Sequence, residues 1–199
     1  MPRWEEGSER RMKQAAMELV EQQGFEATSA VQIAERAGVT TRTFFRYFAD
    51  KKEIFFADSE ALNEALVEEL LQAGDLSRPL RAVISTLAGH DWEKLGSREM
   101  LRRRSQVIAS NPALLERDLI KQRRMADGLR EALCERGIDP EIAELASDTG
   151  SQVFRMAYRR WLESGEDTDL PTIVENVVSL LAAVVTRDAA KSDRESVGL

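Results

Sequence analysis

Cysteine and histidine are nearly absent from this chain of 199 residues, which contains one of each. Cys134 cannot form an internal disulfide, and so few ligands exclude a zinc site with the usual spacing. We therefore expect no metal and no cofactor. His90 lacks the partners that a catalytic base needs, and neither a glycine-rich phosphate loop nor an HExxH motif is present. An enzymatic function is disfavoured.

Long apolar runs are also missing. No stretch approaches the roughly 20 apolar residues that span a bilayer, and the N-terminus is charged rather than signal-like. These features predict a cytoplasmic protein without a membrane partner. Hydrophobic residues still make up 43 % of the chain and charged residues 32 %, which is typical of a globular protein with a sizeable core.

Segments that alternate long enough to form a strand are lacking, whereas helical periodicity recurs along the chain. Proline follows a capping residue at Asn111-Pro112 and Asp139-Pro140, as it does at helix starts. The pattern predicts an all-α protein of about nine helices. Beyond residue 79, the expected helices are Leu80 to Leu87, Arg98 to Ser110, Pro112 to Arg136, Pro140 to Glu163 and Leu170 to Arg187.

A break at residues 74–79, which contains glycine and proline, is the expected domain boundary. Residues 1–52 are predicted to form the N-terminal domain, which consists of a mobile arm over the first seven residues and a three-helix head. One long helix from Lys51 to about residue 73 would link the head to a second helical domain over residues 74–199.

The strongest functional pattern begins at Thr28. Thr28 or Ser29 can cap a first short helix, and Gly38 permits the positive φ that ends a helix. Thr40 can then cap a second short helix over residues 41–47. Two short helices joined by a tight turn at glycine form a helix-turn-helix, whose second helix enters the major groove of DNA.

Composition distinguishes the second of these helices from a simple packing motif. Its hydroxyl and guanidinium groups can bond base edges and phosphates, while Phe44 and Phe48 can anchor its other side. Lys51 falls at the predicted start of the next helix, where a cation opposes the helix dipole and requires an external anion such as phosphate. The predicted DNA contacts are Thr28, Thr40, Thr41, Arg42, Thr43, Phe45, Arg46, Tyr47 and Lys51.

The net charge of −7 argues against indiscriminate binding to nucleic acid. Residues 1–52 carry nine Lys and Arg against eight Asp and Glu, a net of +1, whereas residues 53–199 carry nineteen against twenty-seven, a net of −8. The basic surface of the head is therefore local, and specificity must rest on base edges more than on phosphates. It would comprise Arg42, Arg46, Lys51 and Lys52, with Arg10, Arg11 and Lys13 as further candidates.

The order and spacing of these residues resemble the TetR family of bacterial transcription regulators, over residues 8–60. The resemblance rests on Gly24-Phe25, Thr28, Ile33-Ala34, Ala37-Gly38-Val39, the aromatic run Thr43 to Phe48, and Lys51. It implies a dimer with an N-terminal DNA-binding head and a helical C-terminal domain that binds a small molecule. Phe45 stands where many members have tyrosine, which leaves Tyr47 as the expected phosphate contact.

The second domain offers candidate contacts for an effector. Its Leu, Val, Met and aromatic residues suit an apolar or amphipathic molecule, and one arginine of the run 102–104 could face a carboxylate or phosphate. Plain core packing and solvated arginines are the alternative interpretation, which stays open. The candidate residues are Trp92, Met100, Arg104, Met125, Phe154 and Tyr158.

The last two predicted helices suggest a subunit interface. The final helix is apolar around much of its girth, so it must be covered on several sides, by its own core alone or also by a partner subunit. The resemblance agrees with the second interpretation, because family members dimerise through their last two helices. The predicted interface residues are Val153, Ala157, Trp161, Val174, Val177, Val178, Leu181 and Val185.

Together these patterns predict a ligand-responsive DNA-binding transcriptional regulator. The resemblance implies a repressor that binds a palindromic operator on double-stranded DNA as a homodimer and is released by a small apolar or amphipathic effector. The alternative is an architectural or protein-interaction module without effector control, because a helix-turn-helix can also serve as a scaffold.

Overall fold

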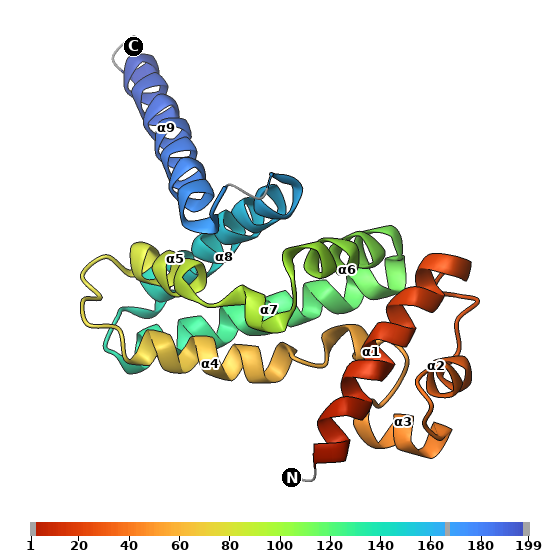
Figure 1. Ribbon diagram of the computed structural model, residues 1–199. Helices are drawn as coiled ribbons and strands as arrows, with labels where there is room; N and C mark the ends of the chain where they lie inside the picture. Colours follow the sequence, from red (N-terminus) through yellow and green to blue (C-terminus); the bar gives the residue numbers. More distant parts are fainter. Residues whose placement is uncertain (1–2, 166–167, 197–199) are drawn as a thin grey trace. The chain divides into compact units, whose positions relative to one another are not determined.

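The computed structural model describes residues 3–165 and 168–196, and the side chains of residues 7–165 and 168–187. This described part contains nine α-helices, two short 3-10 helices and no strand, which confirms the predicted all-α class (Figure 1). The elements in chain order are α1 (Arg3–Gln23), α2 (Ala30–Arg36), α3 (Thr41–Tyr47), η1 (Glu53–Phe56), α4 (Ser59–Leu71), α5 (Pro79–Gly89), η2 (Trp92–Leu95), α6 (Arg98–Ser110), α7 (Pro112–Glu135), α8 (Pro140–Glu163) and α9 (Leu170–Ser196).

The chain folds into two compact units. Unit 1 comprises Met1–Leu62 and Leu95–Arg123, and unit 2 comprises Asn63–Lys94 and Arg124–Leu199. The chain therefore passes from unit 1 to unit 2 within α4, returns to unit 1 at the end of η2, and passes to unit 2 again within α7. This division by contacts does not coincide with the functional division into residues 1–52 and 74–199, which stays a prediction.

A single apolar cluster holds unit 1 together. Helix α1 contributes the stripe that its 3.6-residue period brings to one face, including Met12 and Leu19. The short helices and η1 close over this stripe, and Val107, Ile108 and Leu114 add the inner faces of α6 and α7. Arg103 of α6 also forms an ion pair with Glu21 of α1, which holds the pKa of that carboxyl below its usual range. These contacts explain why α6 packs with the N-terminal helices.

Two local predictions for unit 1 are wrong. Helix α1 already begins at Arg3, so most of the expected arm is helical; the side chain of Trp4 lies outside the described residues. The single helix expected from Lys51 is instead η1 followed by α4. Ile54, Phe55 and Phe56 are all buried, and an α-helix covered on one face would leave one of these three consecutive side chains exposed.

Unit 2 is built around the contact between α5 and α8. Gly150 of α8 allows this close approach, because a Cβ atom at that position would lie 2.7 Å from Cγ1 of Val83 on α5. Helix α8 begins after Asp139, whose Oδ1 accepts from the backbone N–H groups of Glu141 and Ile142 at 3.0 and 3.3 Å. The first turns of α9 pack on α8 through buried Ile173, Val174 and Val177.

The second half of α9 extends past α8, with no other helix of unit 2 beside it (Figure 1). It continues to Ser196 rather than ending at Arg187, and its Leu180, Val184 and Val185 are about half exposed or more. The segment Leu170–Arg187 is long and apolar enough, by length and composition, to cross a membrane. The sequence interpretation missed this segment, although the packing helix of a soluble protein meets the same criterion.

Replacement of Gly150 by alanine should destabilise unit 2. The added methyl would force Val83 or its helix to move, at a cost of about 1–3 kcal/mol in the free energy of unfolding, measured by urea denaturation. Gly89→Ala is the matched control, because a Cβ atom there meets nothing within 4 Å. Equal stability of the two variants would contradict the close α5–α8 contact.

Candidate nucleic-acid interface

Helix α2 begins with a complete capping box. The Oγ of Ser29 accepts from the backbone N–H of Gln32 at 3.2 Å, and Oε1 of Gln32 accepts from the backbone N–H of Ser29 at 2.8 Å. Ser29, and not Thr28, is therefore the cap. The helix ends at Arg36, and the φ of +67° at Gly38, two residues later, lets the N–H of Val39 reach the carbonyl of Ala34 at 2.9 Å.

Helix α3 begins at its own cap and is anchored on one side only. Thr40 Oγ1 accepts from the backbone N–H of Thr43 at 3.0 Å, and the two hydroxyls lie 2.9 Å apart. Phe44 has no exposed surface and packs against Phe48, with 5.3 Å between the ring centroids. This arrangement directs the opposite side of α3 outward. Its exposed side chains are Arg42, Phe45 and Arg46, with Thr41 and Tyr47 half-buried at the edges.

Thr28 lies inside the head instead of on its surface. Its side chain is 2 % exposed, and its hydroxyl donates to the carbonyl of Gly24 at 2.8 Å. This bond closes the turn between α1 and α2. Thr28 therefore stabilises this turn instead of capping α2. A contact in which its hydroxyl donates to DNA would require this hydrogen bond to break.

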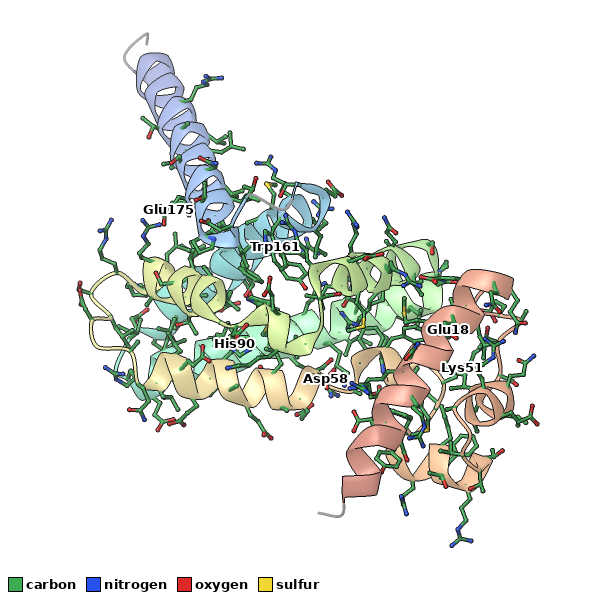
Figure 2. All side chains as sticks on the ribbon, in the orientation of Figure 1. Glu18, Lys51, Asp58, His90, Trp161 and Glu175 are labelled. Atoms are coloured by element: carbon green, nitrogen blue, oxygen red, sulfur yellow. The ribbon has the colours of Figure 1, made fainter. Side chains whose placement is uncertain are left out.

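Lys51 is also directed inward. Its Nζ donates to the carbonyls of Phe25 and Thr28 at 2.9 and 3.0 Å and lies 4.2 Å from the ring centroid of Phe25 (Figure 2). The argument that Lys51 requires an external anion is therefore wrong, because the turn between α1 and α2 supplies the negative partial charge. Arg11 does the same for the next turn, since its Nε donates to the carbonyl of Ala37 at 3.0 Å.

The basic surface of the head is smaller than the sequence suggested. Lys13 is paired with Asp58 at 2.8 Å and with Glu9 at 2.7 Å. Burial alone would lower the pKa of Lys13, but its hydrogen bonds to these two carboxylates outweigh burial and raise it. Arg42 is exposed and, among the residues that the structure describes, has no ion-pair partner. Arg42 is therefore the strongest candidate for reading a base edge.

The predicted effector residues are divided between the two units. Trp92, Phe154 and Tyr158 come together in unit 2, where Trp92 stacks on Phe154 with 5.0 Å between centroids. Met125 is half-buried in the same unit. Met100 and Arg104 instead belong to unit 1.

Neither of these two unit 1 residues has the environment expected of a pocket residue. Met100 is 45 % exposed. Arg104 donates through Nε to the carbonyl of Phe55 at 2.6 Å, so its guanidinium already has an acceptor within the protein.

Most of the predicted interface residues are buried within their own chain. This is so for Val153, Ala157, Trp161, Val174 and Val177, while Val178 and Leu181 are half-buried and Val185 is 60 % exposed. The sequence pattern could not separate core residues from interface residues, because α9 is apolar on several faces and periodicity does not say which of them packs on α8. The large apolar side chains that do face outward on α8 and α9 are Ile142, Leu145, Met156, Leu180, Val184 and Val185.

Two capped helices joined at glycine, with polar and cationic groups on the open side of the second, define a helix-turn-helix protein of the DNA-binding class. The sequence profile described as "Bacterial regulatory proteins, tetR family" matches residues 14–57. The chain is 31 % identical over 174 residues to the HTH-type transcriptional regulator TcmR of Streptomyces glaucescens, across 79 % of this chain and 74 % of TcmR. The chain belongs to the TetR family, and it is a DNA-binding transcriptional regulator.

Solved structures share the fold at lower sequence identity. NalD of Pseudomonas aeruginosa, the secondary repressor of the MexAB-OprM multidrug efflux pump, superimposes with a TM-score of 0.60 at 21 % identity, covering 90 % of this chain and 96 % of NalD. The repressor FadR of Thermus thermophilus, in complex with lauroyl-CoA, superimposes with a TM-score of 0.52 at 20 % identity, covering 87 % and 93 %. These likenesses establish the all-α architecture with an N-terminal helix-turn-helix.

Replacement of Lys51 by methionine should destabilise the head even without DNA. The carbonyls of Phe25 and Thr28 would lose a charged donor, which should lower the free energy of unfolding by about 1–3 kcal/mol. Lys52→Met removes the same charge one residue later and should stay within about 0.5 kcal/mol. Thermal and urea unfolding of both variants test this, and equal stability would show that the inward bonds of Lys51 are unimportant.

Proposed function

We propose that this protein is a cytoplasmic repressor that binds a palindromic operator as a homodimer and is released by a small amphipathic effector. The observation that carries the proposal is the one-sided anchoring of α3. Phe44 fixes its inner face, so Arg42 and Phe45 are held outward in a defined orientation. Arginine can bond the O6 and N7 atoms of guanine in the major groove, and an apolar ring can contact a thymine methyl.

The hydrogen bonds of Arg11 and Lys51 to backbone carbonyls favour base reading over charge attraction. Cations that are bonded to the protein's own carbonyls are poor candidates for releasing counterions from DNA. Few phosphate contacts then remain, and the expected salt dependence of binding is modest. Selectivity among DNA sequences must then come from the exposed side of α3, chiefly from Arg42.

Exposed apolar side chains on α8 and α9 support a homodimer. Leu145, Val184 and Val185 are 69, 50 and 60 % exposed, which is unusual for such side chains on one pair of packed helices. A second copy that contributes the same face would cover both in a two-fold arrangement. Such a dimer would place two copies of α3 in major grooves about 34–36 Å apart, or a multiple of that distance, on a palindromic site.

The interior of unit 2 supports an effector site. The Oδ1 of Asn63 and the Oγ of Ser151 are buried and, among the described residues, have no hydrogen-bond partner. Buried polar atoms without partners are rare in native proteins and costly, so a ligand that supplies the partner is a physical explanation. Ser151 lies on the same stripe of α8 as Phe154 and Tyr158, at spacings of three and seven residues. A ring or chain carrying a polar group fits such surroundings.

Binding-site selection from a random duplex pool tests the DNA-reading function. We expect an enriched palindrome, whose half-site spacing reports the dimer geometry. Arg42→Ala should weaken binding to the selected site by about 1–3 kcal/mol and relax the preference at one base pair in each half-site. Arg36→Ala is a suitable control, because Arg36 is exposed and paired with Glu18. Absence of any palindrome would favour an architectural module instead.

Ser151 and Ser147 provide a matched pair for testing the effector site. Both are buried on α8, but the hydroxyl of Ser147 already donates to the carbonyl of Ala143 at 2.6 Å. Hydroxylated aromatics and medium-chain fatty acids can be screened by quenching of tryptophan fluorescence. For a compound that also releases the operator, Ser151→Ala should weaken affinity by about 1–2 kcal/mol and Ser147→Ala should not. Equal effects would remove Ser151 from the site.

A further inference from the structure

The 3-10 helix η1 is held by charged side chains that lie far from it in the sequence. The carboxylate of Glu53, at its first residue, accepts from Nε of Arg117 at 2.6 Å and lies 3.4 Å from Nζ of Lys121. The Glu53 side chain is only 19 % exposed and that of Lys121 only 16 %. All three residues belong to unit 1, although two of them come from α7.

The other end of η1 is held in the same way. Nε of Arg104, on α6, donates to the carbonyl of Phe55 at 2.6 Å, and its guanidinium carbon lies 5.5 Å from the ring centroid of Phe56. Carbonyls at the end of a helical segment carry partial negative charge, so a cation there is favourable. Cations from α6 and α7 thus contact both ends of a four-residue segment.

This segment is packed into the support of α3. Ile54, Phe55 and Phe56 share one buried cluster with Phe44 and Phe48. Interiors are close-packed, so a shift of η1 would move the aromatic side chains against which α3 is anchored. Lys51, which bonds to the turn between α1 and α2, lies two residues before the segment. The orientation of α3 therefore depends on where η1 lies.

We propose that Glu53, Arg117 and Lys121 are positioning residues for operator recognition. They act through η1 on the angle at which α3 meets the base edges, without contacting DNA themselves. This inference rests on the proposed function, in which α3 reads the operator. It assigns part of the specificity to two residues of α7, outside the helix-turn-helix.

The variant Glu53→Gln distinguishes a positioning role from a simple charge effect, because the two predict opposite changes in affinity for the operator. The variant removes one negative charge from the DNA-binding head, and charge alone would strengthen binding to every duplex. A positioning role predicts the reverse for the selected operator, whose affinity should fall about tenfold, because misplaced base contacts typically cost one to two orders of magnitude. Affinity for a random duplex should stay equal or rise. Titrations of both duplexes at two salt concentrations give the ratio directly.

Three further variants exclude indirect explanations. Glu26→Gln removes the same charge from an exposed side chain of unit 1 that forms no ion pair among the described residues, and its operator-to-random ratio should equal that of the wild type. The charge exchange Glu53→Lys with Arg117→Glu should restore most of the ratio that each single change loses. Thermal unfolding of every variant shows whether the head remains folded, and Arg117→Gln should lower the ratio even if Glu53→Gln does not fold.

The outcomes distinguish this inference from the proposed function. If the wild type prefers no sequence, operator reading by α3 fails and the inference fails with it. If the wild type is selective and folded Glu53→Gln keeps the same operator-to-random ratio, only the positioning role is overturned. Loss of operator affinity that the charge exchange restores supports the inference.

Discussion

Complete burial of the Phe44 ring is the constraint on which the DNA-binding head depends. One side of a seven-residue helix can be held this firmly only if several elements supply the surrounding surface, and here α1, α2, η1 and the inner faces of α6 and α7 share one apolar cluster. An isolated helix of this length would be marginal in water. The outward display of Arg42 is therefore a property of the whole unit rather than of α3.

Capping residues, glycines and prolines in the sequence correctly predicted the features of the fold that depend on interactions within a few residues. The capping threonine at residue 40, the glycine at residue 38 and the prolines after Asn111 and Asp139 act within a few residues, and the helices predicted from them begin where expected. The helix-turn-helix could be recognised for the same reason. The 3-10 segment could not, because burial of Ile54, Phe55 and Phe56 on all sides comes from elements far along the chain.

The candidate site was predicted in outline, but the partners of its charges were not. Lys51 and Arg11 each donate to a carbonyl that lies 26 residues away in the sequence. No period or motif encodes such a pairing, so both cations were interpreted as available to DNA. Which face of α9 would meet a partner subunit could not be predicted, for a related reason. The apolar sequence of α9 indicates that the helix must be covered. Only the packing in the structure shows that Val174 and Val177 are covered by their own chain.

The commitment of Lys51 and Arg11 to backbone carbonyls has a consequence for how the protein searches a chromosome. Proteins that slide along DNA rely on a sequence-independent attraction, which grows with the number of cations available to phosphate. A head with few such cations leaves the duplex soon after each random encounter. Most free molecules would then travel by three-dimensional diffusion, and the time needed to find one site would depend more on copy number than on scanning along the double helix.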